Sequence, residues 1–250
     1  MRKPFVLIAA GLALSAVLIA PAARAATAGL PGEWQEWTPG NDITNTASLQ
    51  RGAGNFMGYC AGCHSIKYVR YSRMGADLKI PEDQLEALVK PGSKKNDYIT
   101  TSLSAADGEA WFGKAPPDLS LITRSKGSDY VYRFLKTYYV DEKTVNGTNN
   151  LALPGTAMPH VLSALQGAQA LKTVKKDGHE HFEGFEQLEP GQLTAAQYDE
   201  FVRDTVNFLE YAGEPAKAKR ISLGVWVMLF LLLFTALAYL LKKEYWRDVK

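Results

Sequence analysis

Both cysteines of this 250-residue chain lie in one short motif, Cys60-Ala61-Gly62-Cys63-His64. The spacing C-x-x-C-H is typical of covalent haem attachment, because two thiols three residues apart on a helical turn can each add to a haem vinyl group. The histidine that follows can then present its imidazole to the iron as the proximal ligand. The sequence therefore predicts one covalently attached c-type haem, bound through Cys60 and Cys63 and ligated by His64.

Two other kinds of site use paired cysteines. A redox-active disulfide of the thioredoxin type would need a βαβ pattern around the motif, and none surrounds it. A zinc site would need two further ligands, and the remaining histidine pair, His179 and His181, has an atypical spacing. The haem interpretation is favoured over both, and His179 and His181 are expected to be exposed loop residues.

The iron of a c-type haem has a sixth position, for which methionine sulfur is one ligand. Met57 precedes the motif on the same helical stretch and Met74 follows it closely, so neither is expected to reach the opposite haem face. Met158 lies between two prolines in Leu153-Pro154-Gly155-Thr156-Ala157-Met158-Pro159-His160, which stiffen the loop. A thioether there would raise the reduction potential, as suits an electron carrier. His160 is the alternative ligand, and an open sixth position would indicate peroxidase or gas-binding chemistry.

Three stretches with the apolar spacing of helices are expected to enclose the haem, so the fold should be mainly α. Ser48 is a plausible cap for the first, Thr194 and Gln197 form a capping box for the third, and Gly213 and Pro215 end it. The three apolar faces consist of Leu49, Ala53, Phe56, Met57 and Cys60; of Val131, Phe134, Leu135 and Tyr138; and of Tyr198, Phe201, Val202, Thr205, Leu209 and Ala212.

The two ends of the chain carry its long apolar runs. Residues 1–25 read as a cleaved secretory signal, with Arg2 and Lys3 before the apolar run and Ala23-Arg24-Ala25 at its exit. A retained N-terminal anchor is the alternative. Residues 217–241 are expected to form one transmembrane helix, because 21 uncharged residues are followed and preceded by bases. A buried core helix would seldom stay uncharged for that length. Residues 26–216 would then be the exported haem domain and 242–250 a short cytoplasmic tail.

Charge is distributed unevenly along the chain. The net charge is +2, of which the predicted signal contributes +3 and residues 217–250 contribute +5, so the body at 26–216 carries −6. An acidic body favours a basic partner and argues against nucleic acid. Its acids concentrate in a stretch that is expected to be a solvated loop, at Asp177, Glu180, Glu183, Glu186 and Glu189.

A second group of motifs is much more specific than C-x-x-C-H. Ala115-Pro116-Pro117-Asp118-Leu119-Ser120 is followed by Arg124 and by Asp129-Tyr130-Val131-Tyr132, and Glu214-Pro215 stands just before the terminal anchor. In this order the motifs closely resemble those of the cytochrome c1 family, from about Trp34 to the C-terminus. The chain is short between the Tyr130 helix and the methionine loop and has no cysteines for an extra disulfide, as in bacterial members.

The resemblance implies a class I cytochrome c-like haem domain with a single C-terminal transmembrane helix. It also implies a role for each matching residue. Cys60 and Cys63 would hold the haem, His64 and Met158 would ligate iron, a carbonyl of Pro116-Pro117 would orient His64, Arg124 would pair with a haem propionate, and Tyr130 would lie beside the haem.

The function implied by the resemblance is electron transfer within ubiquinol–cytochrome c reductase, with no substrate-turnover site in this chain. The Rieske iron–sulfur protein would reduce the haem, a soluble or anchored cytochrome c would accept the electron, and cytochrome b would be a further partner. The haem domain would lie in the periplasm on a bacterial inner membrane. A membrane-anchored cytochrome c that serves an oxidase or another respiratory complex is the first alternative. A haem peroxidase is the second, although no residue is an evident distal base.

Overall fold

The computed structural model describes residues 30–176 and 178–248, so the expected signal at 1–25 lies outside the described residues. Within them helices predominate, and the strands form three separate two-stranded antiparallel pairs: β1 with β2, β3 with β4, and β5 with β6. In chain order the elements are η2 (Glu33–Glu36), α2 (Thr46–Tyr59), β1 (Ile66–Arg70), α3 (Tyr71–Leu78), α4 (Glu82–Leu88), β2 (Tyr98–Ile99), α5 (Ala105–Phe112), α6 (Ile122–Lys126), α7 (Ser128–Lys136), β3 (Tyr138–Val140), β4 (Thr148–Asn150), α8 (Ser163–Gln166), β5 (Gly167–Lys176), β6 (His179–Pro190), α9 (Ala195–Gly213) and α10 (Lys217–Tyr245).

Helices α2 and α9 pack closely against each other at the centre of the body. Gly52 makes this approach possible, because a Cβ at that position would lie 2.0 Å from the carbonyl oxygen of Asp204 on α9. The Asp204 side chain is buried at the same crossing. It accepts hydrogen bonds from the Ser48 hydroxyl at 2.6 Å and from Arg51 Nε at 2.5 Å. These donors compensate the cost of removing the carboxylate from water.

The expectation that Ser48 caps α2 is wrong. The cap is Asn45, whose side-chain oxygen accepts a hydrogen bond from the Ser48 backbone N–H at 3.1 Å. Ser48 lies inside the first turn, and its hydroxyl faces Asp204 instead. The capping box at the start of α9 is confirmed, since both the Thr194 and the Gln197 contacts are present, and α9 ends at Gly213.

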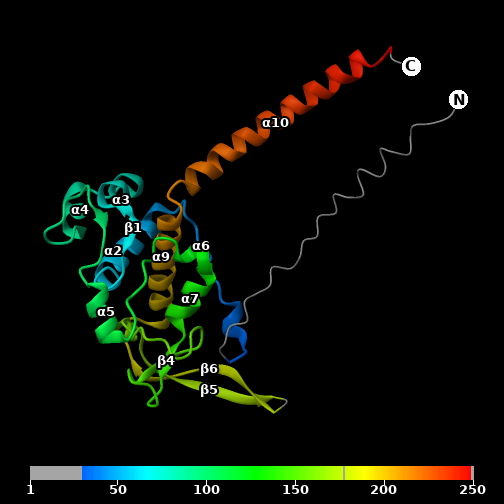
Figure 1. Cartoon of the computed structure of the whole chain (residues 1–250). Helices are drawn as coiled ribbons and strands as arrows, with labels where there is room; N and C mark the ends of the chain where they lie inside the picture. The colour runs from blue at the N-terminus through cyan, green and yellow to red at the C-terminus, as the bar shows by residue number, and fades with distance from the viewer. Residues whose placement is uncertain (1–29, 177, 249–250) are drawn as a thin grey trace.

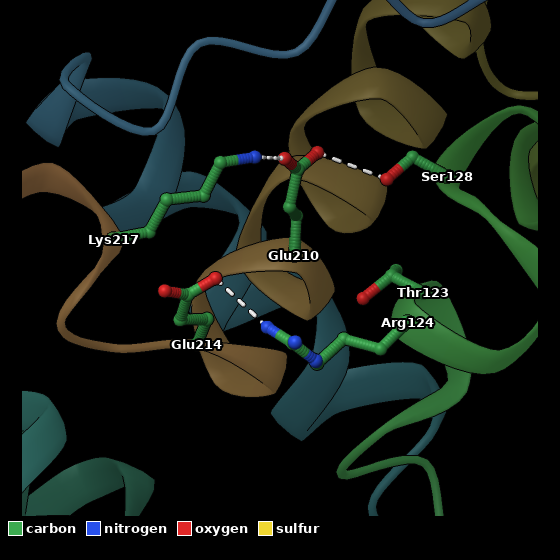
Figure 2. Close-up of a pocket in the computed structure, with 6 residues that line it drawn as sticks. All are labelled: Thr123, Arg124, Ser128, Glu210, Glu214 and Lys217. Carbon is green, nitrogen blue, oxygen red and sulfur yellow. Dashed lines mark hydrogen bonds and ion pairs between the residues drawn. The ribbon is translucent and has the colours of Figure 1, made fainter. Parts of the chain in front are cut away.

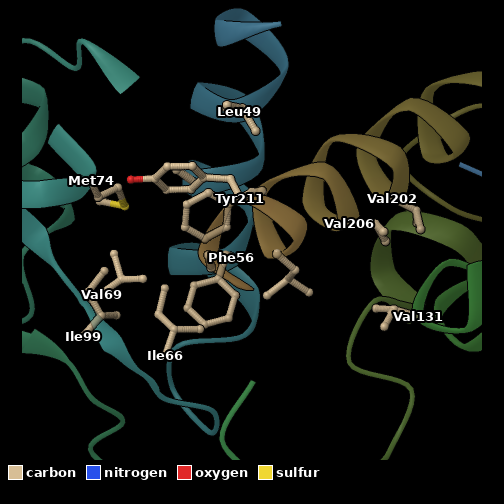
Figure 3. Packing of buried hydrophobic residues seen from close by; sticks show 14 of the residues in the cluster. Leu49, Phe56, Ile66, Val69, Met74, Ile99, Val131, Val202, Val206 and Tyr211 are labelled. Carbon is tan, nitrogen blue, oxygen red and sulfur yellow. The ribbon is translucent and has the colours of Figure 1, made fainter. Parts of the chain in front are cut away.

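The main apolar core lies between α2, α9 and the segments that follow the cysteine motif (Figure 3). Met74 is completely buried in this core on α3, beside Tyr211 of α9. Its thioether is therefore a packing group. Tyr138 does not extend the apolar face of α7, because that helix ends at Lys136 and Tyr138 begins β3. The core includes Leu49, Phe56, Ile66, Val69, Met74, Ile99, Val131, Val202, Val206 and Tyr211.

The expectation of a loop is wrong for His179–Pro190, which the structure places in strand β6, paired with β5, while Asp177 lies outside the described residues. Phe182 attaches this strand to the body. Its ring is buried, packs edge-on against Trp37 with 6.1 Å between ring centroids, and lies against Gly32. The Phe182 backbone N–H also donates to the carbonyl of Pro31 at 2.9 Å. The acidic side chains of β6 are exposed, whereas Phe182 is buried. The β5–β6 hairpin therefore contacts the N-terminal segment through Phe182 and leaves its acids in solvent. The exposed acids are Glu180, Glu183, Glu186 and Glu189.

Helix α10 extends away from the body (Figure 1). It has 29 residues with a mean hydropathy of 2.4 over its most apolar window, and none of that window is buried. The expected start at Lys217 agrees with the helix, while the helix continues past residue 241 to Tyr245. Its length and composition suit a membrane span.

Candidate functional site: the cysteine motif and its surroundings

The C-x-x-C-H motif forms a turn directly after α2. The Cys60 N–H still donates to the helix carbonyl of Phe56 at 2.9 Å, and the His64 N–H donates to the carbonyl of Cys60 at 2.8 Å. These bonds bring the two cysteines and His64 onto one turn. Both thiols are free and half-buried, so no Cys60–Cys63 disulfide is formed. Burial, with a smaller effect of Cys63, raises the pKa of the Cys60 thiol to about 12.

The His64 ring is buried and bonded through one nitrogen. Its Nδ1 lies 2.7 Å from the carbonyl oxygen of Pro117. A carbonyl can only accept, so Nδ1 carries the proton and Nε2 keeps its lone pair. Burial lowers the pKa of His64, although the bond to Pro117 acts in the opposite direction, and this favours the neutral ring. A neutral imidazole with a fixed Nδ1–H is the form that ligates a metal, so His64 fits an axial haem ligand.

The segment that carries Pro117 is fastened to the residues after His64. The Leu119 N–H donates to the carbonyl of Ser65 at 2.8 Å, and the Lys67 N–H donates to Asp118 Oδ2 at 3.0 Å. On the other side, α5 approaches Pro116 so closely that a Cβ at Gly108 would lie 2.6 Å from the proline Cδ. The double proline is thus held between α5 and the cysteine motif.

Met158 lies in an irregular loop and is half-buried against the main core, as is Cys60. Its backbone carbonyl accepts a hydrogen bond from the Tyr138 hydroxyl at 3.0 Å. The next side chain, His160, stacks on the Tyr138 ring with 4.7 Å between centroids and 6° between planes. Burial lowers the pKa of His160 to about 4, and its Nε2 is buried without a hydrogen-bond partner among the described residues.

Arg124 lies at the junction between the body and α10 (Figure 2). Its Nη1 forms an ion pair with Glu214 at 2.8 Å, and Glu214 also binds Arg220 at 2.8 Å. Lys217 pairs with Glu210 beside it, around a cavity of about 100 Å³. The structure therefore brings Arg124 against an acid of α9's C-terminal end rather than against another expected site residue.

Tyr130 is half-buried and packs against both the main core and a second apolar cluster, and its ring is stacked on Phe134 at 6.3 Å and 22°. The second cluster consists of Trp34, Leu151, Ala152 and Phe182. Tyr138 is the residue near the expected site whose role the sequence did not reveal. Its spacing from Phe134 identified an apolar face, but nothing in the sequence linked its hydroxyl to the methionine loop. His179 and His181 lie in β6, where His179 is exposed and His181 half-buried.

Comparison with known proteins gives a consistent result. The model of the family described as Cytochrome C1 matches residues 41–249. The chain is 45% identical to cytochrome c1 of Allochromatium vinosum, over 93% of this chain and 96% of that protein. It is 30% identical to cytochrome c1 of Rhodospirillum rubrum, over 98% and 97%. It is also 43% identical to a protein named ammonia monooxygenase gamma subunit of Nitrosomonas europaea, over 83% and 86%. The chain belongs to the cytochrome c1 family.

Proposed function

We propose that this chain receives one electron from the Rieske iron–sulfur protein of a quinol–cytochrome c reductase and passes it through a covalent haem c to a cytochrome c. The observation that carries the proposal is the bond between His64 Nδ1 and the Pro117 carbonyl. It joins the general haem-attachment motif to the double-proline segment that is specific to the family, and it leaves Nε2 available to a metal. The cytochrome c1 family is an electron-transfer family, and the membership of this chain in it supports the redox role.

The residues of the site divide into attachment, ligation and packing. Cys60 and Cys63 would form the two thioether bonds, and His64 and Met158 would be the axial ligands. The haem would supply one-electron redox chemistry at a potential set by its axial ligands. Tyr130 would pack beside the haem.

Arg124 would contribute charge. A guanidinium has five N–H donors, and the Glu214 contact is made through Nη1. Arg124 can therefore bind a propionate as a second carboxylate.

The anchor and the charge of the body support the proposed setting. Helix α10 would cross the bacterial inner membrane, with the haem domain in the periplasm and the last residues in the cytoplasm. Cytochrome b and the Rieske protein would be the membrane partners. The net charge of −6 on residues 26–216 would steer a basic cytochrome c toward the body.

A second candidate is a c1-like subunit of a different respiratory complex. The relative named ammonia monooxygenase gamma subunit is nearly as similar to this chain as the cytochrome c1 of Allochromatium vinosum. The haem residues would serve either complex equally, so the partners decide between the two candidates.

Affinity purification tests the choice. The chain is tagged beyond Lys250, native membranes are solubilised in mild detergent, and the copurified proteins are identified by mass spectrometry and haem spectra, with an untagged strain as background. A two-haem cytochrome b and a Rieske protein in equal amounts are expected. Oxidase or monooxygenase subunits in their place would overturn the reductase proposal.

A further inference from the structure

Tyr138 is a buried residue that contacts the methionine loop. It is 1% exposed and begins β3, where it pairs with Asn150 of β4. The Gln169 side-chain amide, from β5, donates to the Tyr138 carbonyl at 2.6 Å. The Phe134 and Tyr138 rings pack edge to face, with centroids 5.4 Å apart and 74° between planes. Residues from several elements therefore restrain the position of Tyr138, and a group that bonds to its side chain is restrained in turn.

The side chain of Tyr138 contacts the loop through both its hydroxyl and its ring. Its hydroxyl donates to the Met158 carbonyl, and its ring lies flat on His160. These contacts fall on residues on either side of Pro159, which has no N–H to donate. Burial raises the pKa of Tyr138 well above its ordinary value, so the hydroxyl stays protonated and remains a donor.

Two other hydrogen bonds restrain the backbone next to the Met158 carbonyl. The Met158 N–H donates to Thr156 Oγ1, within the loop itself, at 3.3 Å. Asn146 donates to the Ala157 carbonyl at 3.3 Å, and this residue is on the exposed turn between β3 and β4. The Tyr138 hydrogen bond is shorter than either and comes from the core, so it is the better-fixed restraint on the Met158 backbone.

We propose that Tyr138 is a positioning residue that holds Met158 in place as the sixth ligand of the haem iron. The inference rests on the proposed function, since it needs a haem whose iron Met158 binds. The hydroxyl would fix the backbone of Met158, and the stack on His160 would fix the chain direction after Pro159. Together they would lower the freedom of the thioether to leave the iron, because a preformed loop loses less entropy when its ligand binds.

The test compares three variants in the detergent-solubilised holoprotein. Tyr138→Phe keeps the ring and removes the hydroxyl. Tyr139→Phe is the matched control, because the neighbouring tyrosine is half-buried and no hydroxyl hydrogen bond to the loop is recorded for it in the described structure. Met158→Leu removes the ligand itself. Each is read by the near-infrared band of methionine-ligated ferric haem and by carbon monoxide binding to the ferrous form, with the haem content measured to confirm attachment.

Carbon monoxide competes with the sixth ligand, so a loosened methionine raises its apparent binding constant. Loss of one buried hydrogen bond predicts an increase of about fivefold in Tyr138→Phe. The near-infrared band should weaken in that variant and be unchanged in Tyr139→Phe. Equal carbon monoxide binding in Tyr138→Phe and the wild type would overturn the positioning role.

Two further outcomes separate this inference from the proposed function. A methionine band that survives in Met158→Leu would contradict the ligation itself, whatever Tyr138 does. If Tyr138→Phe incorporates no haem, His160→Leu replaces it, because this variant removes the ring stack and leaves the hydroxyl in place. Where the wild type shows the methionine band, which excludes His160 as the ligand, raised carbon monoxide binding in His160→Leu supports the proposal, and unchanged binding overturns it.

Discussion

The Nδ1 atom of His64 and the carbonyl oxygen of Pro117 lie 2.7 Å apart, although 53 residues separate them in the sequence. The contact assigns the ring proton to Nδ1 and directs Nε2 away from the double-proline segment. It also explains why the cysteine motif and the proline motif occur together. One supplies the donor ring, and the other determines which of its nitrogens is available to the iron.

Replacement of the proposed sixth ligand should change the potential without releasing the haem. In Met158→Leu we expect the reduction potential to fall by more than about 0.1 V, because axial ligands control much of the range that haem proteins cover. The haem should stay attached, since Cys60 and Cys63 are unchanged. Redox titration of the purified protein measures the potential. An unaltered value would indicate a different ligand, with His160 the first to examine.

The α2–α9 crossing provides a paired stability test. Gly52→Ala would place a Cβ 2.0 Å from the Asp204 carbonyl oxygen, and we expect it to lower the free energy of unfolding by about 1–3 kcal/mol or more. Gly54→Ala, on the same helix, meets no atom within 4 Å and should raise it by up to about 1 kcal/mol. Chemical unfolding followed by far-ultraviolet circular dichroism compares the two. Changes of the same sign would contradict the close approach of α2 and α9 at Gly52.

The Asp199 carboxylate should contribute to the free energy of unfolding in a way that depends on pH. Burial alone would raise its pKa, but hydrogen bonds from Lys136 and Tyr132 outweigh burial and lower the pKa below 3.8. A carboxyl with a lowered folded-state pKa stabilises the fold above its unfolded pKa and loses that contribution as the pH falls through the folded value. Asp199→Asn should therefore cost about 1 kcal/mol near neutral pH, and the difference from wild type should shrink as the pH falls below 3.8.

Denaturant unfolding at several pH values measures this difference. Glu200→Gln is the control on the same helix, because its ion pair with Arg51 is largely exposed and should contribute little. A difference between Asp199→Asn and wild type that does not depend on pH would show that the carboxylate charge is not responsible.

The charge of the body makes the acceptor reaction sensitive to salt. With −6 on residues 26–216, the second-order rate constant for reduction of a basic cytochrome c should fall as ionic strength rises, because salt screens the attraction. Stopped-flow measurements over a series of salt concentrations test this expectation. A rate constant that does not change with salt would exclude electrostatic steering by the body.

Local patterns predict the presence of α2, α7 and α9, because apolar spacing and capping act over a few residues. The Thr194–Gln197 capping box and the end of α9 at Gly213 agree with the sequence. Asn45 and Ser48 are both good caps locally, so the pattern does not distinguish them, whereas the Ser48 hydroxyl bonds to a buried carboxylate 156 residues away, at Asp204. The many acids of β6 favour a solvated loop in the sequence, and the contact of Phe182 with Trp37, far apart in the chain, is visible only in the structure.

The expected site could be predicted in its motifs but not in its long-range contacts. C-x-x-C-H is local, so the chemistry of Cys60, Cys63 and His64 follows from spacing. The approach of Pro117 to His64 followed only from resemblance to a family. The Tyr138–Met158 bond joins two segments that share no pattern, so no feature of the sequence indicated it. The contact of Arg124 with Glu214 is also long-range, because it depends on how α6 meets the end of α9. The sequence alone indicates only the propionate role that the family resemblance implies.

The most direct test of the account is the redox behaviour of the c-type haem in the purified native complex. Quinol is mixed rapidly with the oxidised complex, the haem of this chain is followed by its absorption, and oxidised cytochrome c is then added. We expect the haem to be reduced by quinol only when the Rieske protein is present, and to be oxidised again by cytochrome c at the rate of turnover. Turnover of the complex while this haem stays oxidised would contradict the account.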